Sequence, residues 1–211
     1  MRGCAGLSLL PMLASAVLVG GCAVALRTLT LNIAYDEAAA SRGPLSSLEP
    51  RRIQVAPVTD KRAVTAQIGY AKNQGGVVVG HAVSGRPVPE IVRDALVAEL
   101  QKNGHAVNSD EPDVVFSADI NEFWFDSPIV IGTVAMTLTV TDGRTGAPLL
   151  TREYRGVYWR RVPAEVVLFD GWEKYKRAGQ YLMNAALQRM MRDLATDQKL
   201  VEALKGASVS R

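Results

Sequence analysis

Histidine and cysteine are scarce in this chain, which has only two of each among 211 residues. The two histidines, His81 and His105, cannot supply the ligand spacing of a zinc site or a Ser-His-Asp arrangement. His81 falls in a predicted strand, where a lone histidine is packed or exposed more often than it is catalytic. No Gly-x-Ser-x-Gly nucleophile motif occurs either. The sequence therefore predicts a protein that is not an enzyme and that has no metal site and no cofactor.

Clusters of acidic residues or glycines are few, and none has the context of a site. Asp110, Glu111 and Asp113 surround a proline in a loop before a strand, so we interpret them as solvated acids. The charged residues 59–62 follow a strand and are typical of a solvated turn, with a site there as the alternative. Gly75-Gly76 lacks the Gly-Lys-Ser/Thr ending of a phosphate-binding loop, so a nucleotide site is weakly supported.

An excess of one charge and a membrane-spanning run are also missing. The formal net charge is +3, and it would fall to +2 without Arg2, a near balance that argues against nucleic-acid binding. The apolar run from Gly6 to Val19 is broken by Pro11 and is shorter than the roughly 20 residues that span a bilayer. No basic stop-transfer cluster follows it, so a transmembrane helix is not favoured.

The same run has the features of an export signal that ends at a cysteine. A basic residue, a short apolar middle and small residues at a cleavage site are typical of secretory signals. The ending Leu18-Val19-Gly20-Gly21-Cys22 resembles the lipobox of bacterial lipoproteins, in which the thiol receives a diacylglycerol and a peptidase cuts before it. We therefore expect Val19, Gly20 and Gly21 to be recognised by the peptidase and Cys22 to carry the lipid. An ordinary cleaved signal with a chance cysteine is the alternative.

Lipidation at Cys22 would set the compartment and the domain layout. In that class of lipoproteins an Asp after the cysteine retains the protein in the inner membrane, whereas Ala23 here favours the outer membrane, on its periplasmic face. Cys4 would be lost with the signal, so no disulfide could form and stability must come from burial. We expect a signal over 1–21, a short tether over 22–27, a single α+β domain over 28–205 and a frayed tail over 206–211.

Periodic patterns predict an α+β domain. Apolar stripes at helical spacing predict helices over 88–103 and from 171 to about 194, with a last short helix over 198–205. Alternating patterns predict strands over 28–33, 52–58, 113–125, 133–142 and 149–160, and a hairpin over 66–85 with its turn at 72–76. Residues 36–50 are predicted to be a loop. Together these patterns predict a two-layer sandwich, a mainly antiparallel sheet with two main helices packed on one face.

The alternation of the strand over 113–125 changes phase once. Val114, Phe116, Ala118 and Ile120 share one face, whereas the next large apolar residues fall on the other face. A bulge near Asn121, or a strand end covered on both sides, would explain the change.

Several short motifs occur in an order that resembles a known family. They are the lipobox, residues 59–62 after a strand, Ile68-Gly69-Tyr70 with Asn73 and Gly75, a helix ending at residues 100–104, a three-strand meander and a C-terminal helix. This order is similar to the YajG family of bacterial lipoproteins over nearly the whole chain after the signal. The resemblance implies a periplasm-facing, palmitate-bearing envelope protein, related in shape to auxiliary lipoproteins of envelope transport.

The function classes that remain open differ in the site that each needs. The favoured class is an accessory envelope lipoprotein with a membrane contact through its lipid, a protein partner and no nucleic-acid ligand. A lipid or glycan carrier would need a deep apolar cavity, and a hydrolase would need a polar cleft. Aromatic and basic residues gather between 152 and 177, so we expect a partner surface at Trp159, Arg160, Arg161 and Trp172. The alternative is that these aromatics are core residues with a solvated basic rim.

Overall fold

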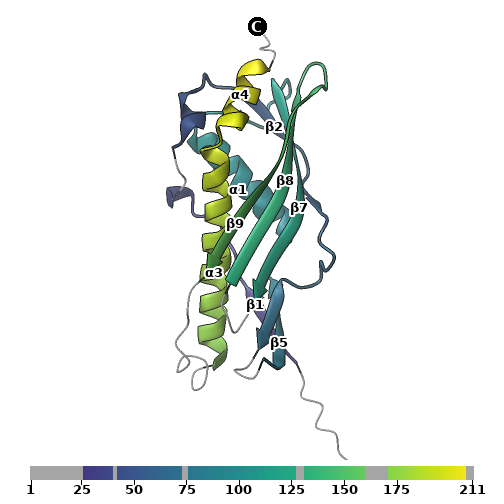
Figure 1. Ribbon diagram of the computed structural model, residues 1–211, viewed down its shortest axis with the longest axis vertical. Helices are drawn as coiled ribbons and strands as arrows, with labels where there is room; N and C mark the ends of the chain where they lie inside the picture. The colour runs from purple at the N-terminus through teal and green to yellow at the C-terminus, as the bar shows by residue number, and fades with distance from the viewer. Residues whose placement is uncertain (1–25, 40–41, 73–75, 127–130, 160–170, 208–211) are drawn as a thin grey trace, which may run out of the picture.

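The computed structural model describes residues 26–39, 42–72, 76–126, 131–159 and 171–207. Figure 1 shows an elongated molecule in which one long helix runs along the length of a twisted sheet. The helical segments are η1 (Glu37–Ala39), η2 (Pro44–Ser47), α1 (Val88–Lys102), α3 (Gly171–Ala195) and α4 (Gln198–Gly206). The strands are β1 (Arg27–Leu31), β2 (Arg52–Val55), β3 (Thr59–Asp60), β4 (Gly69–Lys72), β5 (Val78–Ser84), β6 (Ala106–Val107), β7 (Val114–Asp126), β8 (Ile131–Asp142) and β9 (Pro148–Trp159).

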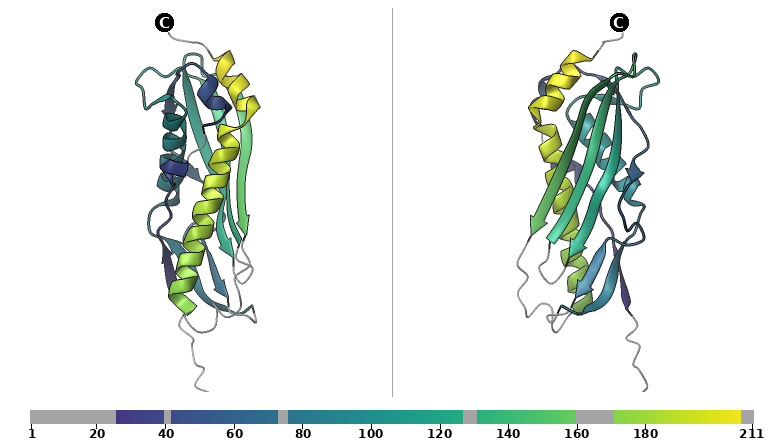
Figure 2. Two further views of the ribbon diagram at one scale, coloured as in Figure 1. Left: turned by 90° about the vertical axis from the view of Figure 1, so that its left-hand side faces the viewer. Right: turned by 45° about the vertical axis from the view of Figure 1, so that its right-hand side comes forward.

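The predicted α+β class is confirmed, and the sheet is a mixed one. The long ladders are antiparallel, because β7, β8 and β9 form the predicted meander and β4 pairs with β5 as the predicted hairpin. The short ladders are parallel. Along its length β7 pairs in turn with β2, β3 and β4, while β1 pairs with β5 and β6 with β2. The helices cover one face of this open sheet, as the two views in Figure 2 show.

A bulge in β7 keeps large apolar side chains on the core face along the whole strand. Ile120 lies opposite Met136, and the register then shifts so that Glu122 lies opposite Ala135. Because one extra residue is inserted at Asn121, the side chains beyond it change faces. Phe123 is therefore fully buried, and the bulge expected from the sequence is confirmed.

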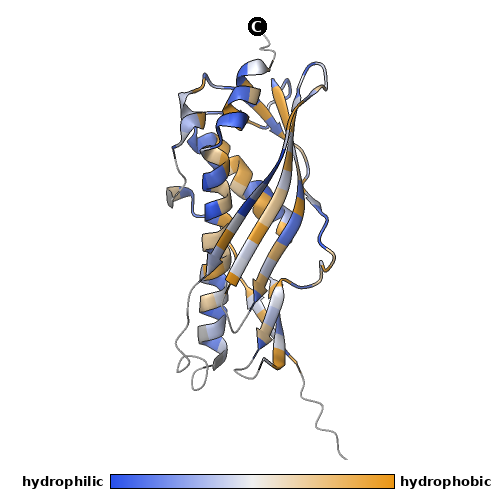
Figure 3. Cartoon of the chain, in the orientation of Figure 1, coloured by the Kyte–Doolittle hydropathy of each residue, from blue (hydrophilic) through white to orange (hydrophobic). Residues whose placement is uncertain are grey.

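Helix α3 approaches the meander at backbone distance, because two strand residues lack side chains. A Cβ atom added to Gly156 would lie 1.9 Å from the carbonyl oxygen of Ala186, and one added to Gly132 would lie 2.8 Å from that of Leu182. Both contacts are closer than real Cβ atoms allow. The helix therefore lies directly on β8 and β9 at these two positions. Figure 3 shows hydrophobic and hydrophilic segments alternating along it.

The predicted loop over 36–50 is more ordered than its composition indicates. It contains η1 and η2, and Leu45 in η2 is fully buried in the main core. A Cβ added to Gly43 would lie 2.4 Å from the carbonyl oxygen of Ala195, so this segment packs on the junction of α3 and α4. No pattern in the sequence predicts β6. This two-residue strand is defined only by its pairing with β2.

Candidate functional site

Trp159, the first residue of the predicted partner surface, ends β9 with its ring in solvent. Its side chain is 69% exposed, the largest exposure among the large apolar residues that the structure describes as exposed. Within the described residues β9 pairs only with β8, so it is an edge strand. The preceding Tyr158 instead turns toward α3, where its ring packs edge-on against Tyr181 with centroids 5.7 Å apart. Trp159 is thus available for a contact outside the domain.

Trp172, in contrast, helps to hold α3 on the sheet. The ring is half-buried and packs against the core, and a Cβ added to Gly80 in β5 would lie 2.4 Å from its Cη2 atom. The guanidinium of Arg27 in β1 lies 5.8 Å from the ring centroid, within the range of a cation–π contact. One turn later, Tyr175 donates a hydrogen bond to the carbonyl oxygen of Lys72, at 2.6 Å. These contacts give Trp172 a structural role at the start of the helix.

The remaining predicted site residues lie outside the described residues. They are Val19, Gly20, Gly21 and Cys22 of the lipobox, with Arg160 and Arg161 of the partner surface. The described chain reaches β1 at Arg27, shortly after Cys22 in the sequence. The positions of these residues therefore stay predictions.

Two arginines of the basic segment form ion pairs within the domain. Arg152 lies 3.1 Å from Asp197, which caps the start of α4, and Arg155 lies 2.6 Å from Glu122 in β7. Tyr154 donates a hydrogen bond to Asp197 at 2.6 Å, and burial together with this carboxylate raises the pKa of the tyrosine. The middle of β9 is therefore joined to α4 and β7, whereas Trp159 at its far end is an exposed large apolar residue.

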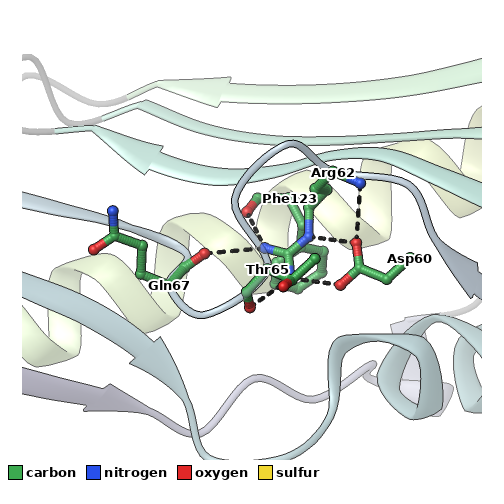
Figure 4. Close-up of polar contacts among 5 residues, drawn as sticks. All are labelled: Asp60, Arg62, Thr65, Gln67 and Phe123. Atoms are coloured by element: carbon green, nitrogen blue, oxygen red, sulfur yellow. Dashed lines mark hydrogen bonds and ion pairs between the residues drawn. The ribbon is translucent and has the colours of Figure 1, made fainter.

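Residues 59–62 are not the solvated turn that the sequence predicted, because Arg62 is buried beneath the loop that follows it. Figure 4 shows its guanidinium surrounded by acceptors. Nε and Nη2 donate to the carboxylate of Asp60 at 2.8 and 2.7 Å. Nη2 also donates to the carbonyl oxygen of Thr65, and Nη1 donates to those of Gln67 and Phe123, each at 3.2 Å. All five guanidinium N–H groups are thus used inside the protein.

The negative charge of Asp60 balances the positive charge of Arg62 beneath this loop. Burial alone would raise the pKa of Asp60, but hydrogen bonds and the charge from Arg62 hold that pKa below its usual value. The prediction of solvated acids before β7 was wrong in the same way for Asp113. That side chain is buried and lies 3.1 Å from Arg52 at the start of β2. Both pairs fasten a short parallel strand to the edge of β7, so we assign them to the fold.

A third buried polar cluster lies between α1 and the segment before η1. Glu99 is fully buried, accepts a hydrogen bond from the Tyr35 hydroxyl and accepts another from Asn103 Nδ2 at 3.2 Å. Burial raises the pKa of Glu99, although these two hydrogen bonds oppose the rise. The helical pattern of α1 alone cannot show this burial, because Tyr35 lies far from Glu99 in the sequence.

Two hollows on the described surface are open to solvent. One, of about 520 Å³, lies between the end of β9 and α3, and is lined by Tyr158, Ala185, Gln188, Arg189, Arg192 and Asp193. The other, of about 390 Å³, lies where the Arg62 loop meets the start of α1. Arg62 lines the second hollow, but its donors are already used. Neither hollow places a nucleophile beside a histidine, because His81 bonds to Thr28 in β1 and His105 is buried elsewhere.

Groups of metal ligands and membrane-spanning helices are both absent from the described ranges. No three His, Cys, Asp or Glu side chains there are grouped closely enough to hold a metal ion. Of the helices that the structure describes, none combines the length and apolar character needed to cross a bilayer.

Comparison with known proteins places the fold among bacterial proteins. No protein-family model and no curated protein matches the chain. Protein XCC0632 from Xanthomonas campestris, of the family DUF330, is similar with a TM-score of 0.54 and 14% identity, covering 81% of this chain and 91% of that one. This likeness shows a shared fold.

Weaker similarities include bacterial lipoproteins. Lipoprotein GNA1162 from Neisseria meningitidis has a TM-score of 0.32 and 13% identity, covering 50% of this chain and 79% of that one. A minor lipoprotein from Acinetobacter baumannii has a TM-score of 0.33 and 10% identity, covering 70% of this chain and 94% of that one.

Proposed function

We propose that this chain is a non-enzymatic, YajG-like lipoprotein of the outer membrane, anchored through Cys22 with its domain facing the periplasm. The observation that carries the proposal is the short distance in sequence between the lipobox and the domain. Only residues 23–26 separate Cys22 from Arg27, the first residue of β1. Five peptide steps span at most about 17 Å, so a lipid on Cys22 would hold the domain directly at the membrane surface.

We propose that the domain acts as an accessory of envelope assembly or transport, and that it contacts a protein partner at the end of β9. Trp159 supplies an exposed aromatic ring there, and Arg160 and Arg161 follow it in the sequence. Tryptophan and arginine are the residue types that most often contribute large binding energies at protein interfaces. Trp172 is left out of this surface, because its contacts with Gly80 and Arg27 serve the fold.

The carrier and hydrolase alternatives have less support. A lipid or glycan carrier needs an enclosed apolar cavity. However, α3 meets β8 and β9 at backbone distance at Gly132 and Gly156, and both described hollows are open. A hydrolase needs convergent titratable groups in a cleft. The best candidate for such a group, the Asp60–Arg62 pair, is fully used in internal hydrogen bonds.

The anchor is tested by labelling cells with radioactive palmitate. Cys22→Ser should abolish the label and leave an uncut precursor, because a hydroxyl cannot replace the thiol in the acyl transfer. Cys4→Ser is the matched control and should keep both the label and the cleavage. Ala23→Asp should move the labelled protein to the inner-membrane fraction. A labelled Cys22→Ser protein would disprove the anchor.

The partner surface needs its own experiment. Trp159→Ala should leave the melting temperature nearly unchanged and should remove a partner that is cross-linked to the wild-type protein in intact envelopes. Tyr181→Ala is the control, since Tyr181 is also an exposed aromatic residue but lies on α3 beside Tyr158. Retention of every cross-linked species by Trp159→Ala would rule out this surface and leave the anchor untouched.

A further inference from the structure

A second buried arginine lies at the corner where β2 and β6 begin. Arg51 precedes β2 and His105 precedes β6, and their side chains meet because these two strands are paired in parallel. The residue exposures are only 8% for Arg51 and 4% for His105. The Arg51 backbone N–H donates to His105 Nδ1 at 3.2 Å, and the Ala106 N–H donates to the Arg51 carbonyl oxygen at 2.9 Å. The corner is therefore held by backbone contacts, while the guanidinium remains available.

The polar atoms left over at this corner are all hydrogen-bond donors. Since Nδ1 of His105 accepts a hydrogen bond, the neutral ring carries its proton on Nε2. Nε and Nη1 of Arg51 are buried without a hydrogen-bond partner among the described residues, and Nε2 of His105 has only a poorly aligned contact with the Leu45 backbone. Buried polar groups in proteins are nearly always paired, and unpaired ones indicate a water or an ion. Two arginine donors without an acceptor, beside a histidine donor whose contact is poorly aligned, indicate a ligand that accepts hydrogen bonds.

The charge at this corner is also uncompensated. The ion pairs formed by arginines of the described residues include Arg52, Arg62, Arg86, Arg152 and Arg155, but none includes Arg51. At the nearby end of α1, the carbonyl oxygens of residues 99–101 accept hydrogen bonds from the backbone of residues 103–105. Burial lowers the pKa of His105 and the Arg51 charge lowers it further, whereas a hydrogen bond with the Leu45 backbone opposes them.

We propose that Arg51 and His105 form a buried binding site for a small oxyanion, either phosphate or a carboxylate group. Nε and Nη1 of the guanidinium are donors on a group that keeps its positive charge, and such charged donors form their strongest hydrogen bonds with anionic oxygens. His105 Nε2, with only its poorly aligned contact to the Leu45 backbone, is a neighbouring donor for the same ligand. A water molecule would accept from these donors but would leave the buried charge unbalanced, which is costly. The site does not depend on the lipid anchor.

The first test uses the fact that the chain has only two histidines. Imidazole signals of the ¹⁵N-labelled protein are followed by NMR while phosphate, acetate or chloride is added at matched ionic strength. Phosphate, acetate or both should move the His105 signals along a saturable curve, and His81 in β5 should stay in place as the internal control. A shift with phosphate alone identifies a phosphate-bearing ligand, and a shift with acetate adds carboxylates. No shift, an equal shift in chloride, or an equal shift of His81 would overturn the proposal.

The second test uses thermal unfolding and separates a ligand site from a structural arginine. Phosphate should raise the Tm of the wild-type protein by about 2–4 °C above matched chloride when the site is near saturation. Arg51→Met should abolish this rise and should have an equal or higher Tm in chloride, because a buried charge without a partner is removed. Arg144→Met, at an exposed turn, should keep the full phosphate effect. A lower Tm for Arg51→Met in chloride, or an unchanged phosphate response, would contradict the site.

Discussion

Arg51 and Arg62 are both buried, and both stand beside short strands that pair in parallel, yet their surroundings are opposite. Arg62 uses all five guanidinium donors, two of them on the carboxylate of Asp60. Arg51 has neither an acid partner nor an acceptor for Nε and Nη1 among the described residues. A buried cation that is fully paired is part of the fold, whereas one that lacks an acceptor indicates a ligand. The burial of an arginine therefore indicates a ligand site only when its guanidinium lacks hydrogen-bond acceptors within the protein.

The largest effect should come from breaking the compensated pair. Arg62→Met should destabilise the domain by about 3–5 kcal/mol, because Asp60 would keep its charge in a largely buried place with no partner. Chemical denaturation of the purified domain measures this loss. Lys61→Met, at the exposed position beside it, should change stability by less than about 0.5 kcal/mol. Equal effects of the two substitutions would mean that the Arg62 network contributes little.

Substitutions of buried apolar residues give a reference for the loss of stability expected of Arg62→Met. Leu138→Ala in β8 and Leu96→Ala in α1 should each cost about 2–5 kcal/mol, because both side chains are fully buried between sheet and helices. Thr137→Ala should cost far less, since this side chain faces away from the helices and bonds to Asn121 at the bulge. Urea unfolding of the three variants checks the two-layer arrangement. Equal losses at positions 137 and 138 would show that both faces of the sheet are buried.

The smallest effect should be a difference in pH dependence between Asp60, which is ion-paired with Arg62, and Glu99, which accepts hydrogen bonds from the neutral Tyr35 and Asn103. The pKa of Asp60 is lowered, so its stabilising contribution is present at neutral pH and is lost as pH falls through that lowered value. The pKa of Glu99 is raised, so its contribution is fully present below the usual pKa of glutamate and is lost as pH rises through the raised value.

Wild-type stability relative to Glu99→Gln should therefore increase as pH falls from neutral toward 5. Over the same range, stability relative to Asp60→Asn should stay constant and should decline only at more acidic pH. Unfolding curves between pH 3 and 8 give both differences. Parallel pH profiles for the two variants would contradict the contrast between the two clusters.

Local patterns predicted most of the elements, because periodicity and end signals are properties of short segments. The strong stripes of α1 and α3, the meander and the bulge at Asn121 all followed from apolar spacing. The parallel ladders did not, since nothing in β2 alone indicates that it will pair with β7. The same limit explains the errors at Arg62 and Asp113. A charged residue after or before a strand is usually solvated, and only the tertiary pairing of these short strands buries both side chains.

The site was predictable to a similar degree. The exposure of Trp159 agrees with a partner surface, whereas the packing of Trp172 on Gly80 depends on a contact between segments far apart in the sequence. Arg51 and His105 gave no signal, because they are single residues with no motif around them. Their meeting needs the β2–β6 pairing, which the sequence did not predict.

The anchor at Cys22 is the central claim, and the intact mass of the protein extracted from envelope membranes tests it most directly. The account predicts a chain that begins at Cys22, lacks residues 1–21 and carries the added mass of a diacylglycerol group. A mature chain that begins at another residue, or an unmodified Cys22 thiol, would contradict it.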